Sequence, residues 1–133
     1  PEYPETYGDI IDWAVKNVEQ PDKKVFFRLS DGKVNVTYAS FRRNVNRICN
    51  FMKDIGIKKG DHVAVFLPNC LEYAFLYHSL GKCGAVIVPI IQFLRGDALR
   101  YILEHSDSTY LITSYDLFSD KIFIIAYVFP YWL

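Results

Sequence analysis

The chain has 133 residues, of which 51% are apolar and 17% aromatic, and its 15 basic residues balance its 15 acidic residues to a formal net charge of zero. A chain of this length is expected to form a single domain over residues 1–133 and to bury roughly two thirds of its unfolded surface. The neutral balance argues against a nucleic-acid partner, because phosphate binding requires a surplus of cations on one face.

The N-terminal part of the chain is predicted to hold a helix followed by a β-hairpin. Apolar residues recur at helical spacing over residues 7–18, with Thr6 as the expected N-cap. Two β-prone runs, residues 25–29 and 34–36, then flank the dipeptide Asp31-Gly32. Because glycine supplies the positive φ that a hairpin turn requires, these runs predict a β-hairpin.

A long amphipathic helix is the next predicted element. Thr37 is expected to cap its start, and Gly56 is expected to end it at the C′ position. Arg42, Arg43 and Arg47 lie opposite the apolar stripe and are interpreted as a solvated helix face. The stripe, at steps of three and four residues, consists of Tyr38, Phe41, Val45, Ile48, Cys49, Met52 and Ile55.

The remaining chain alternates between strands and helices. The predicted strands are residues 63–67, 85–90 and 109–113. The first two lack polar alternation and are expected to be buried. Residues 71–82, capped by Asn69, and residues 96–105 are predicted helices. This order predicts an α/β fold in three layers, with a parallel β-α-β-α-β sheet covered by helices and preceded by a helix and a β-hairpin.

The C-terminal part is predicted from its apolar composition. Residues 114–118 are expected to begin a short helix. The apolar run at residues 122–129 is shorter than the roughly 20 residues that span a bilayer, so a buried strand is expected and not a membrane span. With no signal peptide expected, a cytoplasmic location is predicted, with reduced thiols in the core. These thiols belong to Cys49, Cys70 and Cys83.

The expected ligand-binding edge of the sheet carries no recognisable phosphate loop. Ligands bind past the carboxyl ends of parallel strands, which here carry Asn69, Gln92 and the dipeptide Thr113-Ser114. The glycines of residues 56–60 precede a strand instead of following one, so this run is interpreted as a turn between helix and strand.

No catalytic constellation can be assembled from the remaining candidates. His62, His78 and His105 are too far apart in sequence to indicate a metal site, and His78 lies in an apolar helix, where a structural role is expected. The acids and serines lack the pairing of a general acid–base couple and the context of a nucleophile. These acids and serines are Asp9, Asp12, Asp61, Glu72, Ser40, Ser79, Ser106 and Ser114. No catalytic, cofactor-binding or metal-ligating residue is therefore assigned.

Several segments carry a recognisable combined pattern of order and spacing. They are residues 37–41, 45–47, 55–64, 67–73, 81–89, 94–103 and 110–113. Residues 67–73 are similar to the pattern LPN-x-x-E-[YF], and residues 81–89 to K-x-G-A-V-x-V-P. The whole resembles the N-terminal region of the adenylate-forming (AMP-binding) enzymes, most clearly over residues 25–113. Within that superfamily it is most similar to acyl-CoA synthetases, including the crotonobetaine/carnitine-CoA ligases.

The resemblance implies an acid-CoA ligase for the full-length family. Such an enzyme uses ATP, Mg²⁺ and CoA to convert a carboxylic acid to an acyl-adenylate and then to an acyl-CoA. Family members are several-fold longer, and their phosphate-binding loop, ribose-binding aspartate and C-terminal catalytic lysine match no segment here. Residues 89–92 also depart from the family's P-I-N-P, and Ser40 stands where a glutamate is usual. The resemblance therefore implies a fragment or truncated form that is inactive alone and binds no cofactor.

Two other readings compete with the ligase fragment. A non-enzymatic α/β module would self-associate, or bind a partner, through the apolar tail from Ile122 or through an open sheet edge. A small-molecule-binding α/β domain of unrelated ancestry is the third hypothesis.

Overall fold

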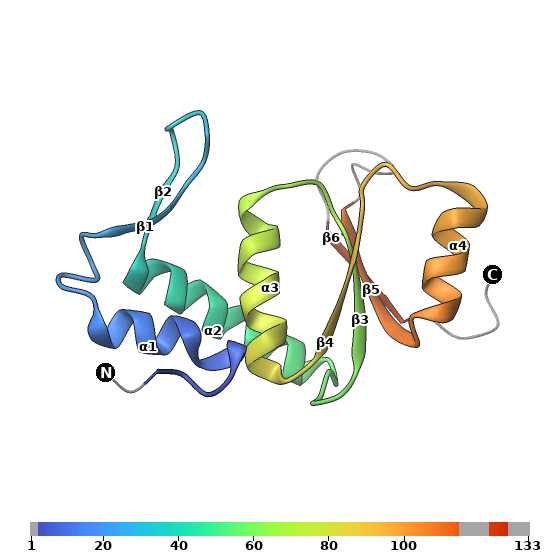
Figure 1. The fold of residues 1–133 in the computed structure, drawn as a ribbon, viewed down its shortest axis with the longest axis horizontal. Coiled ribbons are helices and arrows are strands. Elements are labelled where there is room, and N and C mark those ends of the chain that lie inside the picture. The colour runs from blue at the N-terminus through green and yellow to red at the C-terminus, as the bar shows by residue number, and fades with distance from the viewer. Residues whose placement is uncertain (1–2, 115–122, 128–133) are drawn as a thin grey trace.

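A four-stranded sheet with helices on both faces forms the centre of the molecule (Figure 1). The structure is a computed structural model, and it describes residues 3–114 and 123–127. The elements in chain order are the 3₁₀ turn η1 (Tyr7–Asp9), α1 (Ile10–Asn17), β1 (Val25–Arg28), β2 (Asn35–Thr37), α2 (Tyr38–Asp54), β3 (His62–Phe66), α3 (Leu71–Cys83), β4 (Val86–Ile90), α4 (Gly96–His105), β5 (Ser108–Ser114) and β6 (Phe123–Tyr127).

The predicted parallel sheet is confirmed. Its strand order is β4-β3-β5-β6, with β3 parallel to both β4 and β5, and β6 antiparallel to β5. At the end of β3, Phe66 lies opposite Ile90 on one side and Thr113 on the other. The carboxyl ends of β3, β4 and β5 therefore meet at one edge of the sheet.

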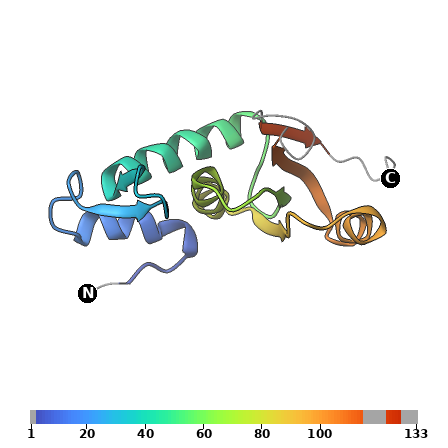
Figure 2. The ribbon, with the colours of Figure 1, turned by 90° about the horizontal axis from the view of Figure 1, so that it is seen from above.

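The central strand β3 is buried on both faces, as its sequence predicts. Val63 and Val65 pack into a core cluster with side chains of α2 and α3, whereas Ala64 and Phe66 pack with side chains of α4. Figure 2 shows α3 and α4 on opposite sides of the sheet. Because side chains alternate along a strand, an uninterrupted apolar run supplies both layers of the core.

Residues 85–90 are predicted to form a buried strand. The strand is present as β4, but the prediction that it is buried is wrong. Strand β4 pairs only with β3, so it lies at an edge of the sheet, and Val86 is 43% exposed. Pro89 is exposed as well, and an edge is where a sheet tolerates a residue that lacks an N–H donor. An apolar composition therefore indicated a strand here without indicating its place in the sheet.

Local signals placed the long helix α2 correctly. The hydroxyl of Thr37 accepts a hydrogen bond from the Ser40 backbone N–H at 3.2 Å, which caps the helix. At the other end Gly56 has a φ of +99°, its N–H donates to the carbonyl of Lys53, and the Ile57 N–H donates to that of Met52. These two hydrogen bonds satisfy carbonyls in the last turn of the helix, and a glycine at the C′ position permits this arrangement.

Of the two other predicted caps, Asn69 is wrong, and Thr6 is correct in position but makes no side-chain cap hydrogen bond. The N-cap of α3 is Cys70, not Asn69, and no side chain hydrogen bond caps the helix there. Thr6 does stand before the first helical residues, but its hydroxyl donates to the Asp9 carboxylate and caps no backbone N–H. The first predicted helix therefore begins as the 3₁₀ turn η1 and continues as α1.

The predicted hairpin is confirmed and packs over the helices. β1 and β2 are antiparallel, and Gly32 in their connection has a φ of +70°. A second core cluster joins the hairpin to α1, α2 and α3 around the fully buried side chain of Phe41. Since α2 and α3 also contribute to the core beneath the sheet, they connect the hairpin to the sheet.

The C-terminal predictions are confirmed in part. Residues 123–127 of the apolar run form β6, but Ser114 is the last residue of β5 and does not begin a helix. Residues 115–118, predicted as helical, lie outside the described residues. Among the described helices, none has the length and apolar character needed to cross a bilayer.

Candidate functional site

The candidate site lies where β3 and β4 end and α3 begins. Two open grooves meet there, of about 510 Å³ and about 440 Å³, and Asn69 and Tyr73 line both. The larger groove is lined by Phe27, Arg28, Leu29, Ser30, Asn69, Cys70, Tyr73, Ala74, Tyr77 and His78. The smaller groove is lined by Leu67, Asn69, Tyr73, Pro89, Ile90, Ile91, Gln92 and Phe93.

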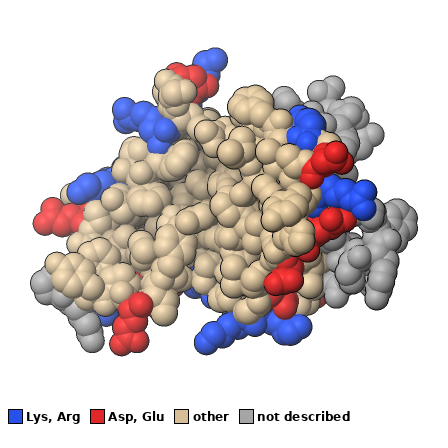
Figure 3. All heavy atoms as spheres, turned by 45° about the vertical axis from the view of Figure 1, so that its right-hand side comes forward, with Lys and Arg blue, Asp and Glu red and all other residues tan. Residues whose placement is uncertain are grey.

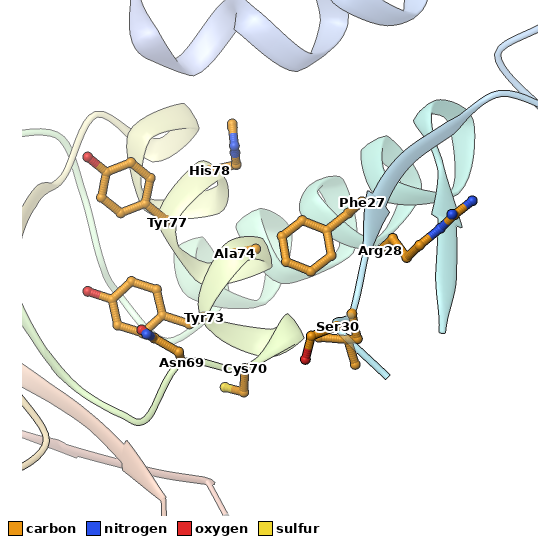
Figure 4. A pocket seen from close by; sticks show the side chains of 10 residues that line it. Phe27, Arg28, Ser30, Asn69, Cys70, Tyr73, Ala74, Tyr77 and His78 are labelled. Carbon is orange, nitrogen blue, oxygen red and sulfur yellow. The ribbon is translucent and has the colours of Figure 1, made fainter. Parts of the chain in front are cut away.

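One face of α3 forms the floor of the larger groove. Tyr73 and Ala74 lie one turn before Tyr77 and His78, so the helix places these four on one face, and Cys70 is the N-cap residue that precedes them. Figure 4 shows this face beside the end of β1.

The wall opposite that floor comes from the hairpin. The ring of Phe27 lies beside Ala74, while the side chain of Arg28 points away from the groove (Figure 4). The Arg28 guanidinium donates instead to the Asn35 side chain, at 2.7 Å. The wall is therefore aromatic, and its cation is directed elsewhere.

His78 is held by aromatic rings, in agreement with a structural role. Its imidazole stacks on Tyr7 with ring centroids 5.1 Å apart and meets Phe41 edge-on at 5.2 Å. The Nε2 atom lies 3.3 Å from the Tyr7 hydroxyl, and Nδ1 has no hydrogen-bond partner among the described residues. Burial lowers the pKa of His78, so the ring is neutral at neutral pH.

Two other titratable groups that line the larger groove, Cys70 and Tyr73, are held in their neutral forms too. Burial raises the pKa of the Cys70 thiol, and burial followed by the neighbouring Tyr77 raises the pKa of the Tyr73 phenol. A nucleophilic cysteine needs a lowered pKa, and Cys70 has the opposite shift. The groove therefore presents aromatic and polar surface without a reactive anion.

Among the described residues, the carboxyl ends of the strands do not present a phosphate-binding set. Asn69 and Gln92 offer amides there, and the nearby cation is Arg95. The guanidinium of Arg95 donates to the backbone carbonyls of Gln92 and Leu94 at 2.6 and 2.7 Å, and it lies 5.5 Å from the centre of the Phe66 ring. One terminal nitrogen of this guanidinium is thus used within the fold.

The other two histidines, His62 and His105, lie in different elements. His62 lies in β3 with its Nδ1 atom 2.7 Å from the Ser106 carbonyl, and His105 packs against Tyr101 at the end of α4. Within residues 3–114 and 123–127, no group of three or more histidine, cysteine or acidic side chains could hold a metal ion.

Asp61 and Ser79 are used in structural contacts, whereas the buried hydroxyl of Ser114 has no hydrogen-bond partner among the described residues. The Asp61 carboxylate accepts the Lys58 backbone N–H at 3.0 Å, and its other oxygen lies 3.7 Å from the Lys58 ammonium. The Ser79 hydroxyl donates to backbone carbonyls of Val45 and Phe75. The glycines of residues 56–60 form the predicted turn, with Gly60 at a φ of +90°.

Sequence reasoning missed an ionic network around Asp12. One oxygen of its carboxylate pairs with the Lys82 ammonium and the other with the Arg42 guanidinium at 2.7 Å, and Lys82 also donates to the Asn46 side chain at 2.6 Å. Arg43 pairs more loosely with Asp22, at 3.7 Å. The basic cluster is thus an exposed helix face, as predicted, with acidic partners that no local pattern revealed.

The cysteines differ from the prediction at one position. Cys49 and Cys83 are buried, whereas Cys70 is only partly buried and lines the larger groove. Spacing along the sequence gave no sign that Cys49 and Cys83 meet. The helical spacing of Cys70, Tyr73, Tyr77 and His78 was visible in the sequence and is the signal that could have located the groove.

Comparisons with known proteins agree on one family. The family model described as AMP-binding enzyme matches residues 13–126. A crotonobetaine/carnitine–CoA ligase of Salmonella arizonae is 40% identical over 91 residues, which are 68% of this chain and 18% of that protein. A second such ligase, from Salmonella paratyphi A, is 42% identical over 78 residues, which are 59% of this chain and 15% of that protein.

Solved structures share the fold. The inhibitor-bound N-terminal domain of FACL13 from Mycobacterium tuberculosis gives a TM-score of 0.75 at 28% identity, over 84% of this chain and 27% of that one. The long-chain-fatty-acid-CoA ligase FadD1 of Archaeoglobus fulgidus gives 0.77 at 23% identity, over 89% and 24%. The chain spans less than a fifth of the length of the curated relatives that it matches. The chain belongs to the AMP-binding enzymes and matches the N-terminal region of their acid–CoA ligases.

Proposed function

We propose that this chain is the N-terminal part of an ATP-dependent acid–CoA ligase. Such an enzyme joins a carboxylate to AMP with release of pyrophosphate and then transfers the acyl group to CoA. The observation that carries the proposal is the 40% identity with a crotonobetaine/carnitine–CoA ligase over 91 residues. That identity makes small carboxylic acids of the crotonobetaine and carnitine type the first substrates to test.

The proposed role of the chain is structural support for the ligand site. Stabilising charge that develops on a phosphoryl group requires donors aimed at the phosphates. The described carboxyl ends of β3 and β4 offer the amides of Asn69 and Gln92, and Arg95 is bound to backbone carbonyls. These residues do not fit ATP or Mg²⁺, so the phosphate-binding groups are expected to come from outside this chain.

We also propose that residues 1–133 behave as one cooperative unit in the cytoplasm. α2 contributes Val45 to one core cluster and Cys49 to the other, so the two clusters share a rigid element. A single transition in urea, followed by both circular dichroism and fluorescence, is the expected result.

A chimera tests the proposed function. Residues 13–126 of this chain replace the matching segment of the Salmonella ligase, and pyrophosphate exchange is measured with crotonobetaine, carnitine and a panel of other acids. The chimera is expected to retain exchange, and the chain by itself is expected to show none. A folded chimera without activity on any acid, or turnover by the purified chain alone, would contradict the proposal.

A self-associating module is the second candidate, and the exposed apolar side chains favour it. Ile91 is 70% exposed and Phe93 is 79% exposed. If the chain acts by self-association, light scattering at high micromolar concentration will report a dimer or larger species. A monomer at that concentration counts against this candidate.

A further inference from the structure

An uncharged surface lines most of the two grooves and continues across them, with Arg28 at the hairpin wall pointing away from the larger one (Figure 4). We call it the neutral face and define it by Asn69, Tyr73, Tyr77, Pro89, Ile91 and Phe93. Asn69 and Tyr73 line both grooves, so the surface is continuous from α3 to the loop after β4. In Figure 3 the central part of the drawn face is free of charged side chains, which gather round its edge.

The chemistry of the neutral face fits a polypeptide better than a small anion. Its large side chains are apolar or phenolic, and Ile91 and Phe93 project into solvent beyond the smaller groove. An exposed apolar surface with a charged rim is the usual form of a protein–protein contact. The amides of Asn69 and Gln92 provide hydrogen bonds at its centre without adding charge.

We infer that the neutral face is the docking surface for the part of the AMP-binding domain that lies outside this chain. The inference rests on the proposed function. The chain covers only 27% of the N-terminal domain of FACL13, so most of a homologous domain remains to be packed against it. In open parallel sheets the ligand lies past the carboxyl ends of the strands, which is the edge where this face lies. The polypeptide that brings the phosphate-binding groups must therefore reach this edge.

The inference is tested by association in trans. The partner is the Salmonella crotonobetaine/carnitine–CoA ligase expressed without the segment that matches this chain, and the dissociation constant is measured by fluorescence anisotropy. Phe93→Ser and Ile91→Ser are expected to weaken binding about tenfold or more each, because a large apolar anchor of an interface is lost.

The matched control variants carry the same kind of change on other faces. Tyr101, on α4, is 62% exposed, and Phe51, on α2, is 50% exposed, and neither lines the grooves. Tyr101→Ser and Phe51→Ser are expected to bind within about twofold of the unmodified chain. Because all four side chains are at least half exposed, all four variants are expected to fold, and circular dichroism checks this.

A second measurement covers the case in which the truncated ligase does not fold. Within the chimera described above, Phe93→Ser is expected to lower the melting temperature by several degrees, while the same change in the isolated chain shifts it by less than about one degree. A side chain that becomes buried only in the assembled domain produces this difference between the two proteins. Tyr101→Ser is expected to change the melting temperature equally little in the chimera and in the isolated chain.

The outcomes separate this inference from the proposed function. An active chimera whose melting temperature is unchanged by Phe93→Ser overturns the docking surface and leaves the proposed function standing. A folded but inactive chimera that Phe93→Ser still destabilises overturns the proposed function alone. Equal binding by all four variants overturns the docking surface. A homodimer of the chain that Phe93→Ser dissociates overturns it as well, since the neutral face would then bind a second copy of the chain.

Discussion

The Sγ atoms of Cys49 and Cys83 lie 3.0 Å apart in the buried core between α2 and α3. The Cys83 thiol also donates to the Cys49 carbonyl, at 3.5 Å. Burial, and then the neighbouring thiol, raises the pKa of Cys83 to about 12. Cys83 therefore stays a neutral thiol, and both buried side chains pack like small apolar groups.

Alkylation by iodoacetamide is expected to distinguish Cys70 from this pair. The thiolate is the reacting form, and it forms more readily where a thiol has access to water. Cys70 is only partly buried, so it will be modified first. Cys49 and Cys83 are buried and will react only as fast as the chain unfolds. Mass spectrometry of the digested protein measures the order. Cys70→Ser should remove the first addition without changing the later ones. Equal rates at Cys70 and Cys83 in the folded chain would contradict the assignment.

The fold was predictable where a few neighbouring residues decide the structure. Thr37 and Gly56 mark the two ends of α2 through hydrogen bonds that reach only three to five residues. The unbroken apolar run of β3 likewise specifies a strand covered on both faces.

Prediction failed where the position of an element in the sheet decides the outcome. β4 is an apolar run like most of β3, but it is an edge strand, and no local pattern records strand order. The grooves depend on where the hairpin places Phe27 relative to α3, and the ionic network on where α1 places Asp12 relative to Lys82. These contacts join segments about 40 to 70 residues apart, so sequence spacing could not supply them.

The ionic network around Asp12 is expected to stabilise the chain at neutral pH. Burial alone would raise the pKa of Asp12, but Lys82 and then Arg42 outweigh it and lower the pKa below its ordinary value of about 3.9. A group whose pKa is lowered in the folded state stabilises the protein above its unfolded pKa. That stabilisation is lost as the pH falls through the lower folded value.

Asp12→Asn is therefore expected to cost about 1 kcal/mol at neutral pH, a value limited by partial exposure to water. The cost should shrink as the pH falls below about 4, where Asp12 of the unfolded chain becomes protonated, and should vanish below the lower pKa of the folded state. Urea unfolding at several pH values measures both effects. Arg43→Gln is the matched control, because Arg43 and Asp22 are 66% and 78% exposed, and no change is expected. A cost that does not vary with pH would contradict the ionic explanation.

Close packing of η1 against α3 depends on two glycines. A Cβ atom at Gly8 would lie 2.7 Å from the Gly81 carbonyl oxygen and 2.9 Å from the Lys82 Cα atom. Because these neighbours are backbone atoms, Gly8→Ala is expected to cost about 1–3 kcal/mol of unfolding free energy.

Gly81→Ala is expected to destabilise as well, although alanine normally stabilises a helix interior relative to glycine by about 0.5–1 kcal/mol. The new Cβ would lie 2.5 Å from the Tyr7 ring. In a Tyr7→Ala background that obstacle is absent, so Gly81→Ala should become neutral or stabilising. Thermal unfolding of the four proteins in this cycle measures the change of sign. A destabilisation that persists without the Tyr7 ring would contradict the packing argument.

Pro89 is expected to protect the open edge of the sheet. The Val86 N–H donates to the Asp61 carbonyl at 2.8 Å, so it points toward the β3 side. Since successive N–H groups of a strand point in opposite directions, those of Ile87 and of position 89 face the open edge. A proline at position 89 removes the second of these donors, which is one way in which proteins block edge-to-edge pairing.

Pro89→Val is therefore expected to promote association of the chain through β4, because it restores a donor on an edge strand that is already rich in β-branched residues. Light scattering across a concentration series measures the effect, with an increase in mean mass expected for this variant. Pro21→Val, in the loop between α1 and β1, is the matched control and should leave the mass unchanged. If Pro89→Val keeps the mass of the unmodified chain at every concentration, then the side chains around β4, and not its missing donor, prevent edge pairing.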